Sequence, residues 1–421
     1  MKFTRALKGR LLYILVGCAL AVNLVIGYTV YSQETESQRQ SEAFEKIGVM
    51  MRVLHLIQQD YVNPEKVEYK NLIYNALHGM VSSLDPHSSF LEPDEFERMM
   101  ETTEGEFGGL GVVVTMKDGK LTVVTPIEGT PGSRAGLVAG DQVLAINGEN
   151  ITSDSLRNIV KKMKGEPGTE VDLKVYRPST EETIEMTIER AVIEVKSVRG
   201  VQSFDKGIQY VRITQFDENT ADELEAALVD LDDEKAFTAL ILDLRNNPGG
   251  LLQAAVDVAS LFLKPDKLVV STVGRQPSQK QKHLTDNGRR WTEIPIVILV
   301  NQGSASAAEI VSGCLQDYGR AVLVGNTTFG KGSVQNIIRL PDGSALRLTT
   351  AKYYTPSKRV IHEKGIDPNI TVELSKEEQR QLIERQAQMT GDSALDPAND
   401  PQLARAIEVL KSYGKFKALT K

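Results

Sequence analysis

The spacing of apolar and polar residues changes several times along this chain of 421 residues. An uncharged run, Leu11–Tyr31, is followed by helical spacing from Ser32 to about Met100. Apolar residues that recur every three or four positions, as in Leu72–Leu84, predict scaffold helices there. Pro86 then interrupts the pattern, because proline disfavours helix at the residue before it.

From about Glu101 to Arg190 the apolar period falls to two, which predicts a small module of short strands. The Asp118-Gly119 pair favours a tight hairpin between Val112–Thr115 and Leu121–Thr125. The other expected elements are strands at Gln142–Ile146, Val171–Tyr176 and Thr183–Ile188, and a helix at Asp154–Lys164. Together they would make a partly open barrel.

Strand-like and helix-like segments alternate from about Ile208 to Val372, which predicts an α/β core. The expected elements are the apolar strands Ala239–Leu242, Ile296–Val300 and Ala321–Val324 and the helices Leu252–Leu263 and Ser306–Leu315. Beyond Leu374 the chain becomes polar and helical. The apolar spacing after Asp400 predicts a last helix that docks on the folded body.

The predicted fold class is therefore multidomain α+β, since helical, β-rich and α/β segments follow one another. The expected divisions are a signal-anchor at 1–31, a helical region at 32–100, a β-rich module at 101–190, an α/β core at 191–373 and a C-terminal helical region at 374–421.

The charges of the chain bear on two questions, its possible partners and its orientation in a membrane. With 49 Lys+Arg against 56 Asp+Glu the net charge is -7, which disfavours nucleic acid as a partner. As a helix, Leu11–Tyr31 would reach roughly 31 Å, enough to cross a bilayer. Four basic residues precede this run, so the positive-inside rule predicts a single-pass inner-membrane protein whose body lies on the periplasmic side.

Two alternatives to an uncleaved anchor are open. One is a signal peptide cleaved after Ala19-Leu-Ala21, and the other is a lipoprotein modified at Cys18. Either would leave apolar Val22–Tyr31 unburied, so the anchor ranks first. The other cysteine, Cys314, is alone in the body of the chain, so no disulfide is expected there.

The histidines and cysteines show no metal-binding spacing, so we predict no metal site and disfavour a zinc hydrolase. No Gly-x-Ser-x-Gly elbow occurs either. A Ser-His-Asp triad stays open because its members need not be close in sequence, and His87 is its best candidate. The alternative is that Asp85-Pro-His-Ser88 forms a structured turn.

Three stretches could bear chemistry. In the first, Ile296–Ile310, an apolar strand leads through small residues into a helix, which would expose a serine at a helix N-terminus. Ser306-Ala-Ala-Glu309 is equally a capping box. In the second, Ala239–Leu252, a glycine turn follows a strand; donors from Gly249 or Gly250 with the Ala307 N–H would make an oxyanion hole. The second motif by itself is an ordinary strand-to-helix turn.

The third stretch places Lys331 between two glycines ahead of an apolar run. In an extended segment Lys331, Ser333 and Gln335 would share one face, so the Gln335 amide could hold the lysine amine. The reference lysine pKa is about 10.4, and burial can lower it by roughly 3 to 5 units, as a general base near neutrality requires. A solvated surface lysine is the alternative.

Taken together, these stretches resemble the carboxyl-terminal processing proteases, tail-specific serine peptidases of family S41. The matching motifs run in the family's order from about residue 45 to 372, and they are Leu84-Asp-Pro-His-Ser, Phe107-Gly-Gly-Leu-Gly-Val112, Asp243-Leu-Arg-Asn-Asn-Pro-Gly-Gly250, Gly303-Ser-Ala-Ser-Ala307, Phe329-Gly-Lys-Gly332 and Gly365-Ile-Asp-Pro368. The resemblance implies an α/β core of the crotonase/ClpP type.

The resemblance also implies roles for individual residues. Ser306, rather than Ser304, would be the nucleophile, Lys331 its general base and Gln335 the residue that orients the lysine. The mechanism that the resemblance implies needs no cofactor. The β-rich module resembles the family's PDZ domain. Its peptide-binding loop would comprise Gly108, Gly109, Leu110, Gly111 and Val112.

A peptide that adds as a strand beside this loop could place its terminal carboxylate on the loop amides. The implied partners are exported protein substrates with free, apolar C-termini, and the family also makes a homo-oligomer or an adaptor protein a candidate. One departure concerns Lys164, where relatives often carry an arginine linked to gating, because lysine lacks the planar donor fork.

Two other classes of function stay open. A PDZ-based binding scaffold on an inactive protease core would fit the departure at Lys164. A crotonase-like acyl-CoA enzyme would also use glycine-rich turns to build an oxyanion hole. The anchor and the PDZ-like module argue against the acyl-CoA enzyme, and labelling by a serine-directed fluorophosphonate would separate the peptidase from the scaffold.

Overall fold

The computed structural model describes residues 40–151, 155–204, 207–233, 237–286, 291–388 and 395–419. The anchor predicted at 1–31 lies outside these residues. Within them, no helix combines the length and apolar character that a membrane span needs. The chain forms two compact units, Met1–Leu84 and Asp85–Lys421.

The first unit is helical where it is described. It contains a helix through 40–60, a 3₁₀ turn η1 (Pro64–Lys66) and α2 (Tyr69–Ser82). Asn63 accepts a hydrogen bond from the Glu65 N–H and so caps the turn. Helix α2 covers most of Leu72–Leu84, so the helix predicted there is confirmed.

The β-rich module is one main antiparallel sheet with a short helix against it. The strand order is β3-β4-β5-β7-β8, with β3 at an edge. The strands are β3 (Val112–Lys117), β4 (Lys120–Pro126), β5 (Gln142–Ile146), β7 (Glu170–Arg177) and β8 (Glu182–Glu189), and β6 (Glu149–Asn150) pairs with β5. Asp118 and Gly119 have φ of 51° and 72°, which confirms the predicted tight hairpin.

Two helices complete this module, α4 (Pro131–Arg134) and α5 (Leu156–Met163). Ser155 caps α5, and Ile159 and Met163 enter the module's core beside Leu173. The chain enters and leaves the module through a separate pair of strands, β2 (Glu106–Gly109) and β9 (Ala191–Glu194). Before them lies α3 (Pro93–Glu104), which begins at a capping box between Glu92 and Glu95.

The α/β core is a six-stranded sheet of order β10-β11-β12-β15-β16-β19, parallel from β11 onward. Its strands are β10 (Val198–Phe204), β11 (Ile208–Ile213), β12 (Ala239–Asp243), β15 (Ile296–Val300), β16 (Ala321–Gly325) and β19 (Ile370–Thr371). The three apolar strands predicted from the sequence are β12, β15 and β16. Every residue of β12 and β15 is buried, as expected of a sheet covered on both faces.

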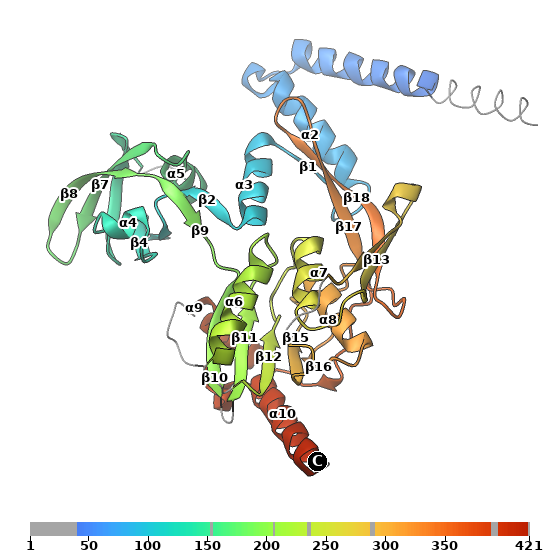
Figure 1. Cartoon of the computed structure of the whole chain (residues 1–421). Helices are drawn as coiled ribbons and strands as arrows, with labels where there is room; N and C mark the ends of the chain where they lie inside the picture. Colours follow the sequence, from blue (N-terminus) through green and yellow to red (C-terminus); the bar gives the residue numbers. More distant parts are fainter. Residues whose placement is uncertain are drawn as a thin grey trace, which may run out of the picture. The chain divides into compact units, whose positions relative to one another are not determined.

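Helices cover both faces of this sheet (Figure 1). One core contains residues of α6 (Thr220–Asp233), α7 (Leu252–Ser260) and α8 (Ala307–Asp317), and the other contains residues of α10 (Pro401–Leu419). Leu240 and Leu242 face the first core, while Ile241 faces the second. The C-terminal region also holds α9 (Lys376–Gln388) and η4 (Pro397–Asn399).

A buried ion network docks the C-terminal segment. The Arg245 guanidinium is 1% exposed and donates to the carboxylates of Asp243, at the end of β12, and Asp400, just before α10. Burial raises the pKa of Asp243, but the charge and hydrogen bonds of Arg245, together with the charge of Arg212, outweigh burial and the net pKa is lowered. The predicted docking of the helix after Asp400 is confirmed.

A second sheet contains strands that we did not predict. Its order is β1-β18-β13-β14, and β17 also pairs with β18 (Figure 1). The strands are β1 (Ser89–Leu91), β13 (Leu268–Gly274), β14 (Gln281–Leu284), β17 (Ser333–Arg339) and β18 (Ala345–Tyr354), and η3 (Pro277–Gln279) lies between β13 and β14. Phe90 pairs with Leu346, so the sheet joins distant parts of the chain.

Candidate active site

Parallel pairing of β12 and β15 brings two turns together. Asp243 is in register with Leu299, so the turns that follow these strands leave the same edge of the sheet. They are then tied directly, since the Ala305 N–H donates to the Asn247 carbonyl at 2.9 Å. The glycine turn of residues 244–251 and the serine turn of residues 301–306 thus form one surface.

The two serines of the second turn have different environments. Ser304 is fully buried; its hydroxyl donates to the Leu244 carbonyl at 2.7 Å and accepts from the Asn301 N–H at 3.0 Å. Ser306 is partly exposed and is the N-cap residue of α8. Its φ of 56° is unusual for a residue with a Cβ. Strain of this kind typically costs about 1 to 3 kcal/mol and concentrates at functional sites.

Gly249 packs directly against Ser306. A Cβ at position 249 would lie 2.6 Å from the Ser306 Cβ and 2.9 Å from the Ala307 nitrogen, so only glycine fits. The Gly249 N–H already donates to Asn247 Oδ1 at 2.8 Å. Within the described chain, the N–H groups of Gly250 and Ala307 have no hydrogen-bond partner. Of the three residues predicted for the oxyanion hole, these two have available donors.

A single carboxylate joins the serine turn to the lysine loop. Glu309 Oε2 accepts from the N–H groups of Ser306 and Lys331, each at 2.9 Å. Its Oε1 accepts from the Gly330 N–H at 2.7 Å and from the Thr328 hydroxyl at 2.6 Å. Glu309 is 0% exposed, and burial raises its pKa although all four bonds oppose the shift. The predicted capping role is therefore one part of a larger connection.

Lys331 is half-buried rather than fully solvated. Burial lowers the pKa of its amine, and the positive charge of Arg347 lowers it further, while the Glu309 charge acts in the opposite direction. The net shift is downward, as a general base needs. In the described residues the amine donates no hydrogen bond to Ser306 or to Gln335.

Gln335 contacts a different set of groups from the one predicted. Its amide donates to Ser333 Oγ at 2.8 Å and to Thr349 Oγ1 at 3.5 Å. The register of β17 against β18 shifts between Val334 and Gln335, so the strict alternation assumed from the sequence does not hold there.

The Asp85–Ser88 segment forms the predicted structured turn. Asp85 Oδ1 accepts from the N–H groups of His87 and Ser88, at 2.7 and 2.8 Å. The turn is anchored to β18 because the Thr349 N–H donates to Ser88 Oγ at 3.0 Å. Burial lowers the pKa of His87, and the nearby Lys331 charge adds to the effect. Its side chain forms no hydrogen bond with Ser306 among the described residues.

The glycine loop of the β-rich module connects β2 to β3. Leu110 is 3% exposed and fills the module's core. Among the described residues, the N–H groups of Leu110 and Gly111 have no hydrogen-bond partner. Because β3 has a free edge, the loop and strand offer donors for a carboxylate and for an added peptide strand.

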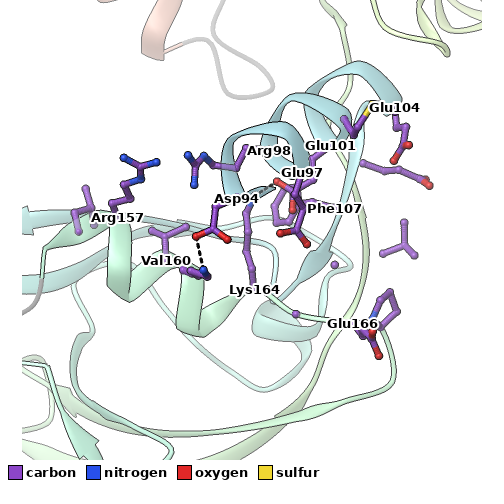
Figure 2. Close-up of a pocket in the computed structure, with 18 residues that line it drawn as sticks. Asp94, Glu97, Arg98, Glu101, Glu104, Phe107, Arg157, Val160, Lys164 and Glu166 are labelled. Carbon is purple, nitrogen blue, oxygen red and sulfur yellow. Dashed lines mark hydrogen bonds and ion pairs between the residues drawn. The ribbon is translucent and has the colours of Figure 1, made fainter. Parts of the chain in front are cut away.

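Lys164 lies at the end of α5, on the wall of a cavity of about 830 Å³ between α3 and the β-rich module (Figure 2). Its amine contacts the Glu101 carboxylate at 2.5 Å and lies 4.3 Å from the centre of the Phe107 ring. A second pair, Asp94 with Lys161, also joins α3 to α5. These contacts connect the module to α3.

Comparisons with known proteins show the family of the chain. The model of peptidase family S41 matches residues 207–372, and that of the PDZ domain matches residues 108–188. A carboxy-terminal-processing protease of Bartonella bacilliformis is 37% identical over 96% of both chains. The chain belongs to peptidase family S41. It is a serine-type carboxy-terminal processing peptidase with a PDZ domain.

Two other similar proteins extend the comparison. The carboxy-terminal processing protease CtpB of Bacillus subtilis is 33% identical over 80% of this chain and 70% of its own. Among solved structures, a photosystem II D1 C-terminal processing protease is 26% identical, covers 77% of this chain and 92% of its own, and has a TM-score of 0.44.

Several residues that surround the candidate site were not recognised from the sequence. Arg347 and Thr349 lie on the unpredicted strand β18, and Asn247 had no assigned role in the glycine turn. Of the residues around the site, Glu309 could have been found from the sequence, because it stands three residues after Ser306 in a capping box.

Replacing Gly249 by alanine should show whether its close packing against Ser306 matters beyond the cost of backbone strain. Both Gly249 and Gly129 have positive φ, 98° and 75°, but no atom lies within 4 Å of a Cβ at Gly129. We expect each variant to lose about 1 kcal/mol of stability from strain. Only Gly249→Ala should also slow fluorophosphonate labelling of Ser306, the candidate nucleophile, by at least tenfold. Equal labelling rates in the two variants would contradict this packing.

Proposed function

We propose that this S41 peptidase cleaves exported proteins near their C-termini through a Ser306–Lys331 dyad. The observation that carries the proposal is the shared acceptor Glu309 Oε2, since it holds the backbones of both residues on one atom. The partial burial and lowered pKa of Lys331 support the role of base. The occupied hydroxyl of Ser304 supports Ser306 as the nucleophile.

The reaction follows from these positions. Neutral Lys331 removes the Ser306 proton as Oγ attacks the peptide carbonyl, and the N–H groups of Gly250 and Ala307 stabilise the oxyanion. The lysine then gives its proton to the departing amine, and the C–N bond breaks. Water, deprotonated by Lys331, hydrolyses the ester and regenerates Ser306. Gln335 is proposed to orient the amine once a substrate is bound.

Selectivity for C-termini is assigned to the PDZ domain. The free amides of Leu110 and Gly111 and the open edge of β3 suit a terminal carboxylate and the strand that precedes it. Gly108, Gly109 and Val112 complete the loop. The substrates would be proteins with free, apolar C-termini.

We propose further that the chain is anchored by Leu11–Tyr31 with its body in the periplasm. The uncharged run and the preceding basic residues support this orientation. N-terminal sequencing of the protein from membrane fractions tests it. An intact start supports the anchor, whereas a start after Ala21 or a lipidated Cys18 would replace it.

The dyad predicts different outcomes for two neighbouring serines. Ser306→Ala and Lys331→Ala should each lower cleavage of a peptide with an apolar C-terminus by at least a thousandfold and keep the melting temperature near that of the wild type. The matched control Ser304→Ala should be less stable, because two buried groups lose their partner, but should still react with a fluorophosphonate. Turnover by Ser306→Ala would refute the assignment.

The pH dependence tests the base. Activity requires neutral Lys331, so kcat/KM should rise with pH through its pKa. Burial and then Arg347 lower that pKa, whereas Glu309 raises it. Arg347→Gln should therefore move the rise to higher pH, and Glu309→Gln to lower pH, while Arg339→Gln should leave it unchanged. Shifts of equal sign in the first two variants would contradict this account.

Lys164 is proposed as a gating residue through its contact with Glu101. Lys164→Met should reduce the stimulation of cleavage by an added C-terminal peptide at least threefold without changing the peptide's Kd. The control is Lys174→Met, whose partner Glu185 lies in the same PDZ domain. Unchanged stimulation in Lys164→Met would exclude gating through this residue.

A further inference from the structure

One buried asparagine contacts both turns of the candidate site. Asn247 is fully buried and lies in the glycine turn that follows β12. Its side-chain oxygen accepts from the Gly249 N–H at 2.8 Å, and its amide nitrogen donates to the carbonyl of Ile213, the last residue of β11, at 2.8 Å. Its backbone carbonyl accepts from the Ala305 N–H of the serine turn at 2.9 Å. Asn247 therefore joins a strand end, the glycine turn and the serine turn.

The residues around Asn247 favour this arrangement. Pro248 has no N–H and disfavours helical backbone at the residue before it, so the next N–H along the chain is that of Gly249. An asparagine whose side chain accepts from the N–H two residues later forms an Asx turn. The chain forms the same turn in its first unit at Asn63-Pro-Glu65, where the bond is 3.3 Å long. Asn247 differs because its amide also reaches a neighbouring strand.

Hydrogen bonds fix two successive peptide planes of the glycine turn. The Gly249 N–H is held by Asn247, and the Gly249 carbonyl accepts from the Phe216 N–H at 2.9 Å. This carbonyl and the Gly250 N–H belong to one planar trans peptide, so they point in opposite directions. Holding the carbonyl on Phe216 therefore turns the Gly250 N–H away from that residue. The Gly250 N–H is left as an available donor with a fixed direction.

We propose that Asn247 is a positioning residue for the oxyanion hole. The proposal rests on the proposed function and deepens it, because the donors concerned are those of Gly250 and Ala307. Asn247 holds Gly249, which precedes the first donor, and Ala305, which lies two residues before the second. Both donors are then in place before the charge develops, and such preorganisation is what makes an oxyanion hole effective. Because Asn247 is fully buried, it acts through the two turns and not on the substrate directly.

The variant Asn247→Ala removes both side-chain bonds and keeps the backbone. We expect kcat to fall about 100-fold, since displacing a group at the reaction centre costs rates of this order, while KM should change less than twofold. The Ki of a peptide boronate, whose tetrahedral oxygen occupies the oxyanion hole, should rise by the factor by which kcat/KM falls. A smaller folded fraction would lower kcat and leave Ki unchanged, so Ki separates positioning from instability.

Two further variants control this result. Asn247→Ser keeps a side-chain oxygen that can accept from the Gly249 N–H, so its kcat should be at least threefold higher than that of Asn247→Ala. Asn63→Ala removes the matching turn of the first unit and should leave kcat, KM and Ki unchanged. If Asn247→Ala does not fold, Asn247→Ser takes its place in the comparison with the wild type.

Hydrogen exchange tests the hold on the turn without relying on cleavage. In Asn247→Ala the Gly249 amide should exchange at least tenfold faster than in the wild type, relative to the Leu240 amide, which donates to the Pro295 carbonyl. Equal protection of Gly249 in the two proteins, or an unchanged Ki, would overturn the proposal. If the wild type neither cleaves the peptide nor binds the boronate, the proposed function fails together with the catalytic role of Asn247. Exchange at Gly249 then still decides whether the side chain holds the turn.

Discussion

The buried carboxylate of Glu309 is the constraint on which the rest of the site depends. It accepts four hydrogen bonds from two loops, the serine turn that follows β15 and the lysine loop that leads from β16 to β17. Hydrogen bonds to a charged group contribute about 1.5 to 3 kcal/mol each, and losing the acceptor would leave three backbone amides unsatisfied. A capping residue at the start of α8 therefore also fixes where the lysine loop lies.

The two sheets supply different parts of the site. The parallel sheet positions the glycine and serine turns, because β12 and β15 are neighbours and their following turns leave the same edge. The antiparallel sheet supplies Arg347 on β18, and Lys331 lies in the loop that enters this sheet at β17. The proposed dyad therefore depends on how these segments are held together, and Glu309 links the serine turn to the lysine loop at that point.

The lysine amine is held in an electrostatic compromise. Burial and the Arg347 charge favour its neutral form, while the nearby Glu309 charge favours its protonated form. The Glu309 carboxylate holds the serine turn and the lysine loop together. Its negative charge therefore also acts on the Lys331 amine and raises the pKa of that amine. Lys331 is partly exposed, so in the proposed dyad a bound substrate would complete the burial of the amine.

The sequence by itself determined the elements whose signals are local. Continuous apolar runs identified β12, β15 and β16, the Asp118-Gly119 pair identified a hairpin, and the motifs around Ser306 and Lys331 identified the family. Only the tertiary structure decided the second sheet, which N–H groups of the glycine and serine turns are unpaired, and the four hydrogen bonds that Glu309 accepts. These depend on pairings between distant segments and on which hydrogen-bonding groups are already occupied, and no spacing along the chain records either.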